Sequence, residues 1–196
     1  MKEDILEQLV DDYLKFKGFF TIHNVKFVPS STDPAYIKKA DAVASDIDVV
    51  GFHPRRKGAG RVWVVSCKSW QGGFNPARRL AYITGNKVIA GREAWRGFRE
   101  LVKKKWADGL ISEIEKLTGS TQFTYVTAVT KLTGDRAVWE EHKPFKKNLR
   151  GNPIKFLTLK EMLDDLYEKT NTTVASSEVG RLLQVIKASD WLDDVQ

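Results

Sequence analysis

Cysteine is nearly absent from this 196-residue chain, since Cys67 is its single example. One cysteine excludes an internal disulfide and any zinc site built from several cysteines. Long apolar runs are missing too, because no stretch approaches the roughly 20 residues that a transmembrane helix needs. The first residues also lack the apolar core of a signal peptide. These absences predict a cytoplasmic protein.

Several common catalytic signatures are also missing. The three histidines, His23, His53 and His142, are dispersed and belong to no motif. No Walker-type glycine loop is present, because the glycines at 58 and 60 have the composition of a turn rather than of a phosphate-binding loop. The sequence therefore offers no histidine-based or P-loop chemistry.

The composition is that of an ordinary globular protein with an excess of positive charge. Hydrophobic residues make up 42% and charged residues 29% of the chain. The formal net charge of +7 favours a polyanionic partner such as nucleic acid, although basic proteins without one are common. The length suits one domain over residues 1–196, with a core over about 1–160 and a helical extension over about 159–196.

Hydrophobic periodicity predicts an α/β fold with a mixed central sheet flanked by helices. A first amphipathic helix begins near Ile5 and ends before Gly18. Alternating or continuous apolar residues predict strands at 19–28, 49–52, 61–67, 123–129 and 154–157. Residues 76–118 are mainly helical in pattern, with breaks near Gly85 and Gly91. Two more helices are expected, one over 159–167 and one from Ser176 or Ser177 to 187.

An acid and a lysine lie at matching ends of two neighbouring predicted strands. Asp48 precedes the apolar residues of one strand, and Lys68 follows Val62 to Val65 of the next. On paired strands the two side chains can converge, and a carboxylate there can hold Mg²⁺ while the ammonium balances charge on a phosphate. The alternative is an unrelated pair, because Asp is common at strand starts and Lys at strand ends.

A longer series of residues gives this pair a context. The series is Glu7 on the first helix, Gly18-Phe19-Phe20, Asp48-Val49-Val50, and Val64-Val65-Ser66-Cys67-Lys68-Ser69-Trp70. It resembles the restriction-endonuclease-like, or PD-(D/E)XK, nuclease superfamily, and within it the branch of type IV restriction enzymes and archaeal Holliday-junction resolvases. The resemblance covers roughly residues 3–75. It implies a restriction-endonuclease-like core and hydrolysis of phosphodiester bonds with Mg²⁺ or Mn²⁺.

The resemblance also implies roles for individual residues. Asp48 matches the metal-binding aspartate, and Lys68 matches the lysine beside the attacking water. The main-chain carbonyl of Cys67 matches a further oxygen around the metal. Glu7 matches the helical acid, although it can equally be one solvated acid on an acidic helix face. The Cys67 side chain itself is expected to be a buried structural thiol.

Ser66 departs from the family pattern, because it occupies the position of the usual glutamate. A serine hydroxyl is a neutral and weak metal ligand. Three explanations stay open: a tolerated variant that still cleaves, a degenerate nuclease that only binds, or an engineered inactive form. Gln71 matches a glutamine that related nucleases carry shortly after the lysine, but its glycine-containing turn equally suits an ordinary polar residue.

Basic residues outside the resemblance suggest a DNA-binding surface. Arg92, Arg96, Arg99 and Lys103 step by four, three and four residues, which predicts one face of a helix lying along a phosphate backbone. A solvated surface is the alternative. Two further groups are expected to contribute, Arg55-Arg56-Lys57 in a turn and Arg78-Arg79 near the site.

The sequence thus predicts a metal-dependent DNA endonuclease. Two alternatives stay open: a catalytically silent nuclease fold that binds DNA, and a subunit of a DNA-processing complex that uses the amphipathic segment 179–186 as its interface. RNA is not distinguished from DNA as the partner. Cutting both strands of a duplex would usually require two active sites, and hence a homodimer.

Overall fold

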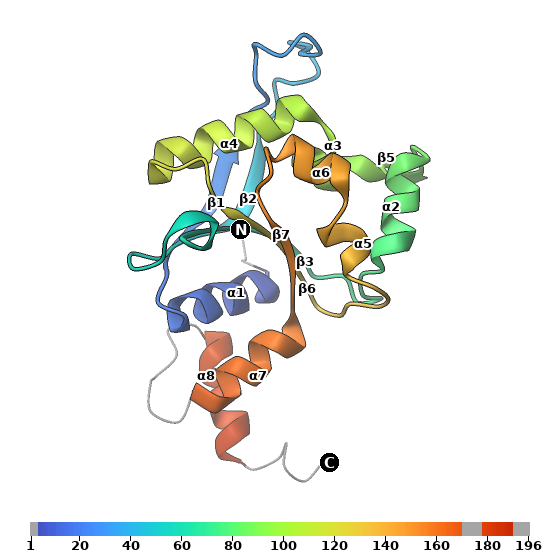
Figure 1. Cartoon of the computed structure of the whole chain (residues 1–196). Helices are drawn as coiled ribbons and strands as arrows, with labels where there is room; N and C mark the ends of the chain where they lie inside the picture. Colours follow the sequence, from blue (N-terminus) through green and yellow to red (C-terminus); the bar gives the residue numbers. More distant parts are fainter. Residues whose placement is uncertain (1–3, 170–177, 190–196) are drawn as a thin grey trace.

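The computed structural model describes residues 4–169 and 178–189 and places a five-stranded sheet at the centre of the fold (Figure 1). The strand order is β1-β2-β3-β6-β7. The strands are β1 (Phe20–Phe27), β2 (Ser45–Phe52), β3 (Val62–Lys68), β6 (Thr124–Val129) and β7 (Ile154–Thr158). β1, β2 and β3 pair antiparallel, whereas β3, β6 and β7 pair parallel. The predicted α/β class with a mixed sheet is confirmed.

Helices cover both faces of this sheet (Figure 1). One face carries α1 (Ile5–Phe16) and α7 (Leu159–Lys169), with α8 (Glu178–Ala188) packed beside them. The other face carries α2 (Pro76–Thr84), α3 (Arg99–Val102), α4 (Lys104–Thr118), α5 (Ala137–Glu140) and α6 (Lys143–Asn148). The short α5 and α6 were not expected from the sequence. Every helix within the described residues is too short or too polar to traverse a lipid bilayer.

Two hydrophobic cores result, one on each face. The core beneath α1 and α7 contains Val10, Leu14, Val49, Val65, Val126 and Met162. The larger core on the other face is rich in aromatic rings, among them Phe74, Phe98, Tyr125, Trp139 and Phe156. β3 and β6 are therefore buried on both sides, which explains the unbroken apolar run Val62 to Val65 in β3 and the absence of apolar–polar alternation in β6.

The segment 85–103 differs from the expectation of a helix. α2 ends at Thr84 with Gly85 as its C-cap, and a two-stranded hairpin follows, formed by β4 (Val88–Ile89) and β5 (Arg92–Glu93). Ala90 and Gly91 close the hairpin with φ of 48° and 75°, a left-handed turn that no helix contains. The short 3₁₀ helix η2 (Ala94–Phe98) then leads into α3. The predicted breaks at Gly85 and Gly91 are confirmed, and the continuous basic helix is wrong.

The long connection from residue 28 to 44 lies against α4. Lys105 of α4 donates hydrogen bonds to the carbonyl of Ala35 at 2.9 Å and to the buried carboxylate of Asp41 at 2.7 Å. A Cβ atom at Gly109 would lie 1.9 Å from the carbonyl oxygen of Val28, so only glycine permits this close approach. The predicted capping serines of α8, at 176 and 177, lie outside the described residues.

Candidate active site

Asp48, Ser66 and Lys68 come together at one end of the β2–β3 pair. The backbone N–H of Cys67 donates to Oδ2 of Asp48 at 2.6 Å, and Nζ of Lys68 donates to Oγ of Ser66 at 2.8 Å. Ser66 and Lys68 share one face of β3 because side chains alternate along a strand. The Lys68 ammonium also lies 5.6 Å from the ring centre of Phe98, on the aromatic face of the sheet. The convergence expected from the sequence is present.

Burial governs the electrostatics of these groups. It raises the pKa of Asp48, although the charge of Lys68 and the N–H of Cys67 oppose this shift. Burial also raises the pKa of the Cys67 thiol well above its ordinary value, and the charges of Asp48 and Glu7 add to the effect. Because the thiol packs in the α1 core and is disfavoured as a thiolate, Cys67 is a structural residue rather than a nucleophile.

The first turn of α1 lies beside the end of β3, but on the other face of the sheet. Asp4 caps α1 by accepting from the backbone N–H of Leu6 at 2.8 Å. Its second oxygen accepts from the hydroxyl of Ser69 at 2.6 Å, which fixes the helix to the residue after Lys68. Glu7 lies in the same turn, within electrostatic range of Cys67. Glu7 thus lies near Cys67 on the α1 face, whereas Asp48 and Lys68 face the aromatic core, and its role as a metal ligand stays a prediction.

Sequence reasoning missed the carboxylate of Glu100. It is 4% exposed, and its Oε1 accepts a hydrogen bond from the hydroxyl of Tyr125, a fully buried residue of β6. Burial raises the pKa of Glu100, although the hydrogen bond from Tyr125 and the charge of Lys68 oppose this shift. One signal was available: Glu100 is the only acid between residues 94 and 107, in an otherwise basic segment.

The oxygen atoms at this end of the sheet limit what metal the site can hold. Within the described ranges 4–169 and 178–189, no three His, Cys, Asp or Glu side chains are placed to share one ion. Mg²⁺, however, is commonly held by one or two carboxylates, with waters and substrate phosphates completing its shell. Thr127 lies beside Ser66 on the neighbouring strand β6. Its buried Oγ1 has no hydrogen-bond partner among the residues that the structure describes. The donors fit a weakly held ion centred on Asp48, not a site of three carboxylates.

The turn after β3 contributes an aromatic stack. Trp70 and Phe74 lie face to face with ring centres 5.5 Å apart, and the guanidinium of Arg79 lies 4.1 Å from the Trp70 ring centre. Burial lowers the pKa of Arg79, and its neighbour Arg78 lowers it further. Arg79 is therefore adjacent to the site through Trp70, as expected. Gln71 is an exposed turn residue.

The turn cluster of Arg55, Arg56 and Lys57 lies far from the site. It connects β2 to β3 at the end opposite to Lys68, and six residues of strand span about 20 Å. All three side chains are exposed, and Arg56 lies 4.9 Å from the ring centre of Phe19. This cluster is too far from Lys68 to belong to the candidate site, although it could contact another part of a long polyanion.

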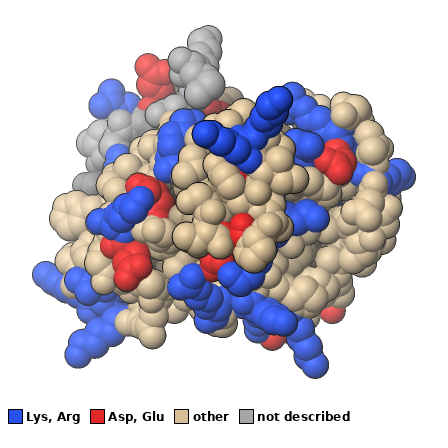
Figure 2. All heavy atoms as spheres, turned by 90° about the horizontal axis from the view of Figure 1, so that it is seen from above, with Lys and Arg blue, Asp and Glu red and all other residues tan. Residues whose placement is uncertain are grey.

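Arg92, Arg96, Arg99 and Lys103 do not share a helical face, but they gather around two hollows. One hollow of about 610 Å³ is lined by Val88, Gly91, Arg92, Glu93, Arg96, Gly97 and Arg99. The other, of about 360 Å³, is lined in part by Trp95, Arg96, Arg99, Lys103 and Lys105. Glu93 forms an ion pair with Arg96 at 2.8 Å, so acid is not absent from this surface. Figure 2 shows Lys and Arg spread over the face seen from above, with a few acids among them.

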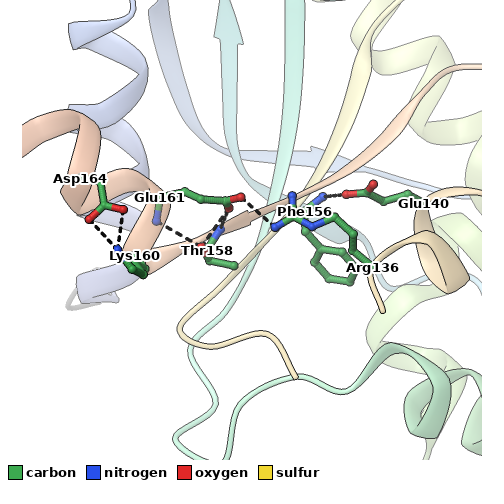
Figure 3. A network of polar contacts seen from close by, with 7 residues as sticks. All are labelled: Arg136, Glu140, Phe156, Thr158, Lys160, Glu161 and Asp164. Atoms are coloured by element: carbon green, nitrogen blue, oxygen red, sulfur yellow. Dashed lines mark hydrogen bonds and ion pairs between the residues drawn. The ribbon is translucent and has the colours of Figure 1, made fainter. Parts of the chain in front are cut away.

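A separate polar network closes the end of β7 (Figure 3). Glu161 accepts from the N–H of Thr158 at 2.7 Å and from Arg136 at 2.8 Å, and its own N–H donates to the Thr158 hydroxyl at 3.2 Å. This reciprocal pairing is a capping box for α7. Burial alone would raise the pKa of Glu161, but these bonds outweigh it and lower the pKa. The network anchors a helix and is not a second site.

Comparisons with known proteins add little to this geometry. Neither a protein-family model nor a curated protein sequence gives a significant match. Among solved structures, the chain is similar to the crystal structure of a protein of unknown function, AF1548, with a TM-score of 0.41 and 14% identity. The similarity covers 83% of this chain and 66% of that one, so this chain spans slightly less than two thirds of the other's length. At this level it carries no conclusion about function.

Proposed function

We propose that this chain is a metal-dependent DNA endonuclease of the restriction-endonuclease-like kind, with Asp48 and Lys68 at its active site. The observation that carries the proposal is their convergence around Ser66: the Asp48 carboxylate, the Ser66 hydroxyl and the Lys68 ammonium lie at one strand end on one face. A carboxylate next to an ammonium is the pair that phosphodiester hydrolysis needs. The basic hollows nearby would hold the flanking phosphates.

Each residue has a distinct task in this proposal. Asp48 would hold a divalent cation, Mg²⁺ or Mn²⁺, with the Cys67 carbonyl as a further oxygen ligand. Glu7 would join it only by reaching around the end of β3 from the α1 face. The cation would supply Lewis-acid stabilisation of charge on the phosphate. Lys68 would leave Ser66, orient the attacking water and neutralise the developing negative charge. Ser66 would hold Lys68 in place until substrate arrives. A cytoplasmic location and a homodimer that cuts both strands belong to the same proposal.

The alternative is a nuclease fold that binds DNA without cutting it. The observation that favours it is the contact between Lys68 and Ser66, because a lysine held by a neutral hydroxyl beside a single carboxylate is also a stable resting arrangement. A subunit role is a third possibility; of the apolar residues proposed for its interface, Leu182 and Val185 are 58% and 66% exposed.

A nuclease assay separates these functions. Purified protein is incubated with supercoiled plasmid, linear duplex, branched DNA, single-stranded DNA and RNA, in Mg²⁺, in Mn²⁺ and in EDTA. We expect nicking or cutting that is faster in Mn²⁺ than in Mg²⁺, because Mn²⁺ binds protein ligands more tightly and this site is short of charge. Salt-sensitive DNA binding without cleavage in any metal would favour the binding protein. Neither binding nor cleavage would favour the subunit.

A further inference from the structure

The two basic hollows share one wall. Both are lined by Glu93, Arg96 and Arg99. The smaller hollow is also lined by Asp41 and two alanines of the connection 28–44, which passes above α4 in Figure 1. Asp41 is 5% exposed and forms an ion pair with Lys105 at 2.7 Å, so this part of the lining is fixed. The smaller hollow is therefore built from two segments that are distant in the sequence.

Positive charge is in excess in both hollows. The larger one has three arginines against a single carboxylate, and the smaller one has two arginines and two lysines against two carboxylates. Of these acids, Glu93 is already paired with Arg96 and Asp41 with Lys105. The charge of the other lining cations is thus not balanced by an acid that lines either hollow. A surface of this kind attracts an anion.

The two arginines of the shared wall are held in place by hydrogen bonds. Nε of Arg96 donates to Glu93 at 2.8 Å, and Nε of Arg99 donates to the carbonyl of Arg96 at 3.1 Å. A guanidinium that is fixed at Nε can still use its two Nη groups on a phosphate. Because a side chain that is already held loses less entropy on binding, this wall suits a phosphate bound in one position.

Aromatic rings lie among the cations of the smaller hollow. The Arg99 guanidinium lies 4.7 Å from the ring centre of Trp106. Lys103 and Arg96 lie 4.9 Å and 5.3 Å from the ring centre of Trp95. Both tryptophans line the hollow, and Trp95 is the more exposed of the two. This hollow therefore combines positive charge with a flat apolar surface.

This combination matches the chemistry of a nucleotide whose base is unpaired. The phosphate needs cations, and the flat base packs on an aromatic side chain. In a duplex the bases stack on one another, so their faces cannot enter a hollow. The larger hollow offers an apolar contact of its own in Val88, which is 60% exposed. Two hollows that share a wall of arginines suit two successive nucleotides with a phosphate between them.

We propose that the hollows bind two successive nucleotides of an unpaired nucleic-acid strand, with the linking phosphate on Arg96 and Arg99 and one base against Trp95. The site lies close to the candidate active site, because Phe98 follows Gly97 of the larger hollow and its ring centre is 5.6 Å from Nζ of Lys68. The preferred substrate is then a single strand rather than an intact duplex. This link to cleavage rests on the proposed function, whereas the binding does not.

The preference is tested by fluorescence anisotropy in EDTA, where no strand is cut. A short oligothymidine, an oligouridine and a duplex of the same length are compared at one salt concentration. We expect oligothymidine to bind at least about tenfold more tightly than the duplex, because stacking of a base adds affinity. A purely electrostatic surface would favour the duplex, which has the higher charge density. The oligouridine shows whether DNA or RNA is held better, and tight binding of either single strand supports the proposal. A duplex that binds as tightly as both would overturn it.

The role of Trp95 is tested by two substitutions that leave the charge unchanged. Trp95→Leu removes the aromatic ring, whereas Trp95→Phe keeps one. We expect Trp95→Leu to weaken oligothymidine binding by about tenfold and duplex binding by less than about twofold, and Trp95→Phe to retain most of the affinity. Urea unfolding checks that both variants fold as the parent does. Equal losses for single strand and duplex would overturn the placement of a base on Trp95.

A crosslink in the unaltered protein locates the base directly. Oligothymidine that carries 5-iodouracil is irradiated with the protein, because this base crosslinks to the aromatic side chains on which it stacks. Tryptic digestion and mass spectrometry then identify the attachment site. We expect it in the peptide Glu93–Arg96, which contains Trp95. Crosslinks confined to other peptides would place the strand elsewhere and contradict the proposal.

These measurements need no cleavage, so they separate the inference from the proposed function. Single-strand preference and a crosslink at Trp95, with no cleavage in any metal, would keep the site and refute the nuclease. Cleavage in Mn²⁺ by a protein that binds duplex and single strands equally would keep the nuclease and refute the site.

Discussion

The end of the β2–β3 pair and the segment 85–103 carry the two halves of the proposed function, and they are built in opposite ways. Asp48 and Lys68 lie on strands buried on both faces of a sheet, so their positions follow from strand pairing. The segment 85–103 consists of a hairpin, a 3₁₀ helix and a single turn of α-helix, and its arginines are held by short local contacts. The proposed chemistry would depend on the rigid sheet, whereas the basic surface is an irregular segment outside that sheet.

Strands buried on both faces leave a stronger signal in the sequence than a segment of short, irregular elements does. The four consecutive apolar residues between Arg61 and Ser66 predict a buried strand regardless of the residues that flank them. A basic residue every three or four positions is compatible with a helix but does not require one. Glycines at 85, 91 and 97 and the left-handed turn at Ala90 decide the outcome locally.

The largest expected effect is the loss of DNA cleavage when Asp48 or Lys68, the two site residues on the strands, is replaced. Asp48→Ala and Lys68→Ala should each reduce plasmid nicking in Mn²⁺ by at least about a hundredfold, since each removes a group that acts on the transition state. Asp46→Asn is the matched control: its carboxylate is two residues away, exposed and paired with Lys26 at 2.7 Å. Cleavage that survives both alanine variants would place the activity elsewhere or in a contaminant.

Substitutions of the arginines in segment 85–103 should change the affinity for DNA rather than the rate of cleavage. Replacing Arg92, Arg96 and Arg99 with Gln should weaken DNA binding whatever the sequence. If each contacts one phosphate, the slope of log K against log salt becomes shallower by roughly three units, at about 0.9 per contact. The measurement is fluorescence anisotropy over a salt series. An unchanged slope would mean that these arginines do not contact phosphates and form an ordinary solvated surface.

A smaller effect is expected on the stability of the folded protein, which the buried carboxylate of Asp48 lowers. Because burial raises the pKa of Asp48, the folded protein holds its proton more tightly than the unfolded chain does. Stability contributed by the protonated form is thus complete below the unfolded pKa of about 3.9 and is lost as pH rises through the folded value.

Asp48→Asn should therefore melt at a higher temperature than the parent at pH 7 in EDTA, with the gap closing toward pH 4. Calorimetric melting of both proteins across this range gives the answer. A variant that melts lower than its parent at pH 7 would mean that the contacts of the ionised carboxylate outweigh its burial.

The smallest effect tests the hairpin itself. Ala90 has φ of 48°, a conformation that glycine adopts without strain. Ala90→Gly should stabilise the protein by roughly 0.5 kcal/mol, because the relief of strain exceeds the added chain entropy. In a helix the same substitution would destabilise by about 1 kcal/mol. The sign of the change in urea midpoint therefore distinguishes the hairpin from the helix that the arginine spacing suggests.

The two regions also differ in how much of their structure could be predicted from the sequence. The five strands, the first helix and the meeting of Asp48 with Lys68 were predictable, because each depends on a local pattern or on the pairing of neighbours. Glu100 was not, since its place beside Tyr125 depends on how α3 packs over a sheet whose strands are distant in the chain. The metal, the DNA and the roles of the site residues stay predictions.

The connection held by Lys105 has a consequence for the order of folding. β2 and β3 are joined by nine residues, so their pairing closes a short loop at little entropic cost. β1 and β2 pair over seven residues against four for β2 and β3, but 17 residues separate them, and that connection is fastened to α4 by Lys105 and Asp41. We expect the strand pair that carries Asp48 and Lys68 to form early, and β1 to join the sheet edge after α4 has docked.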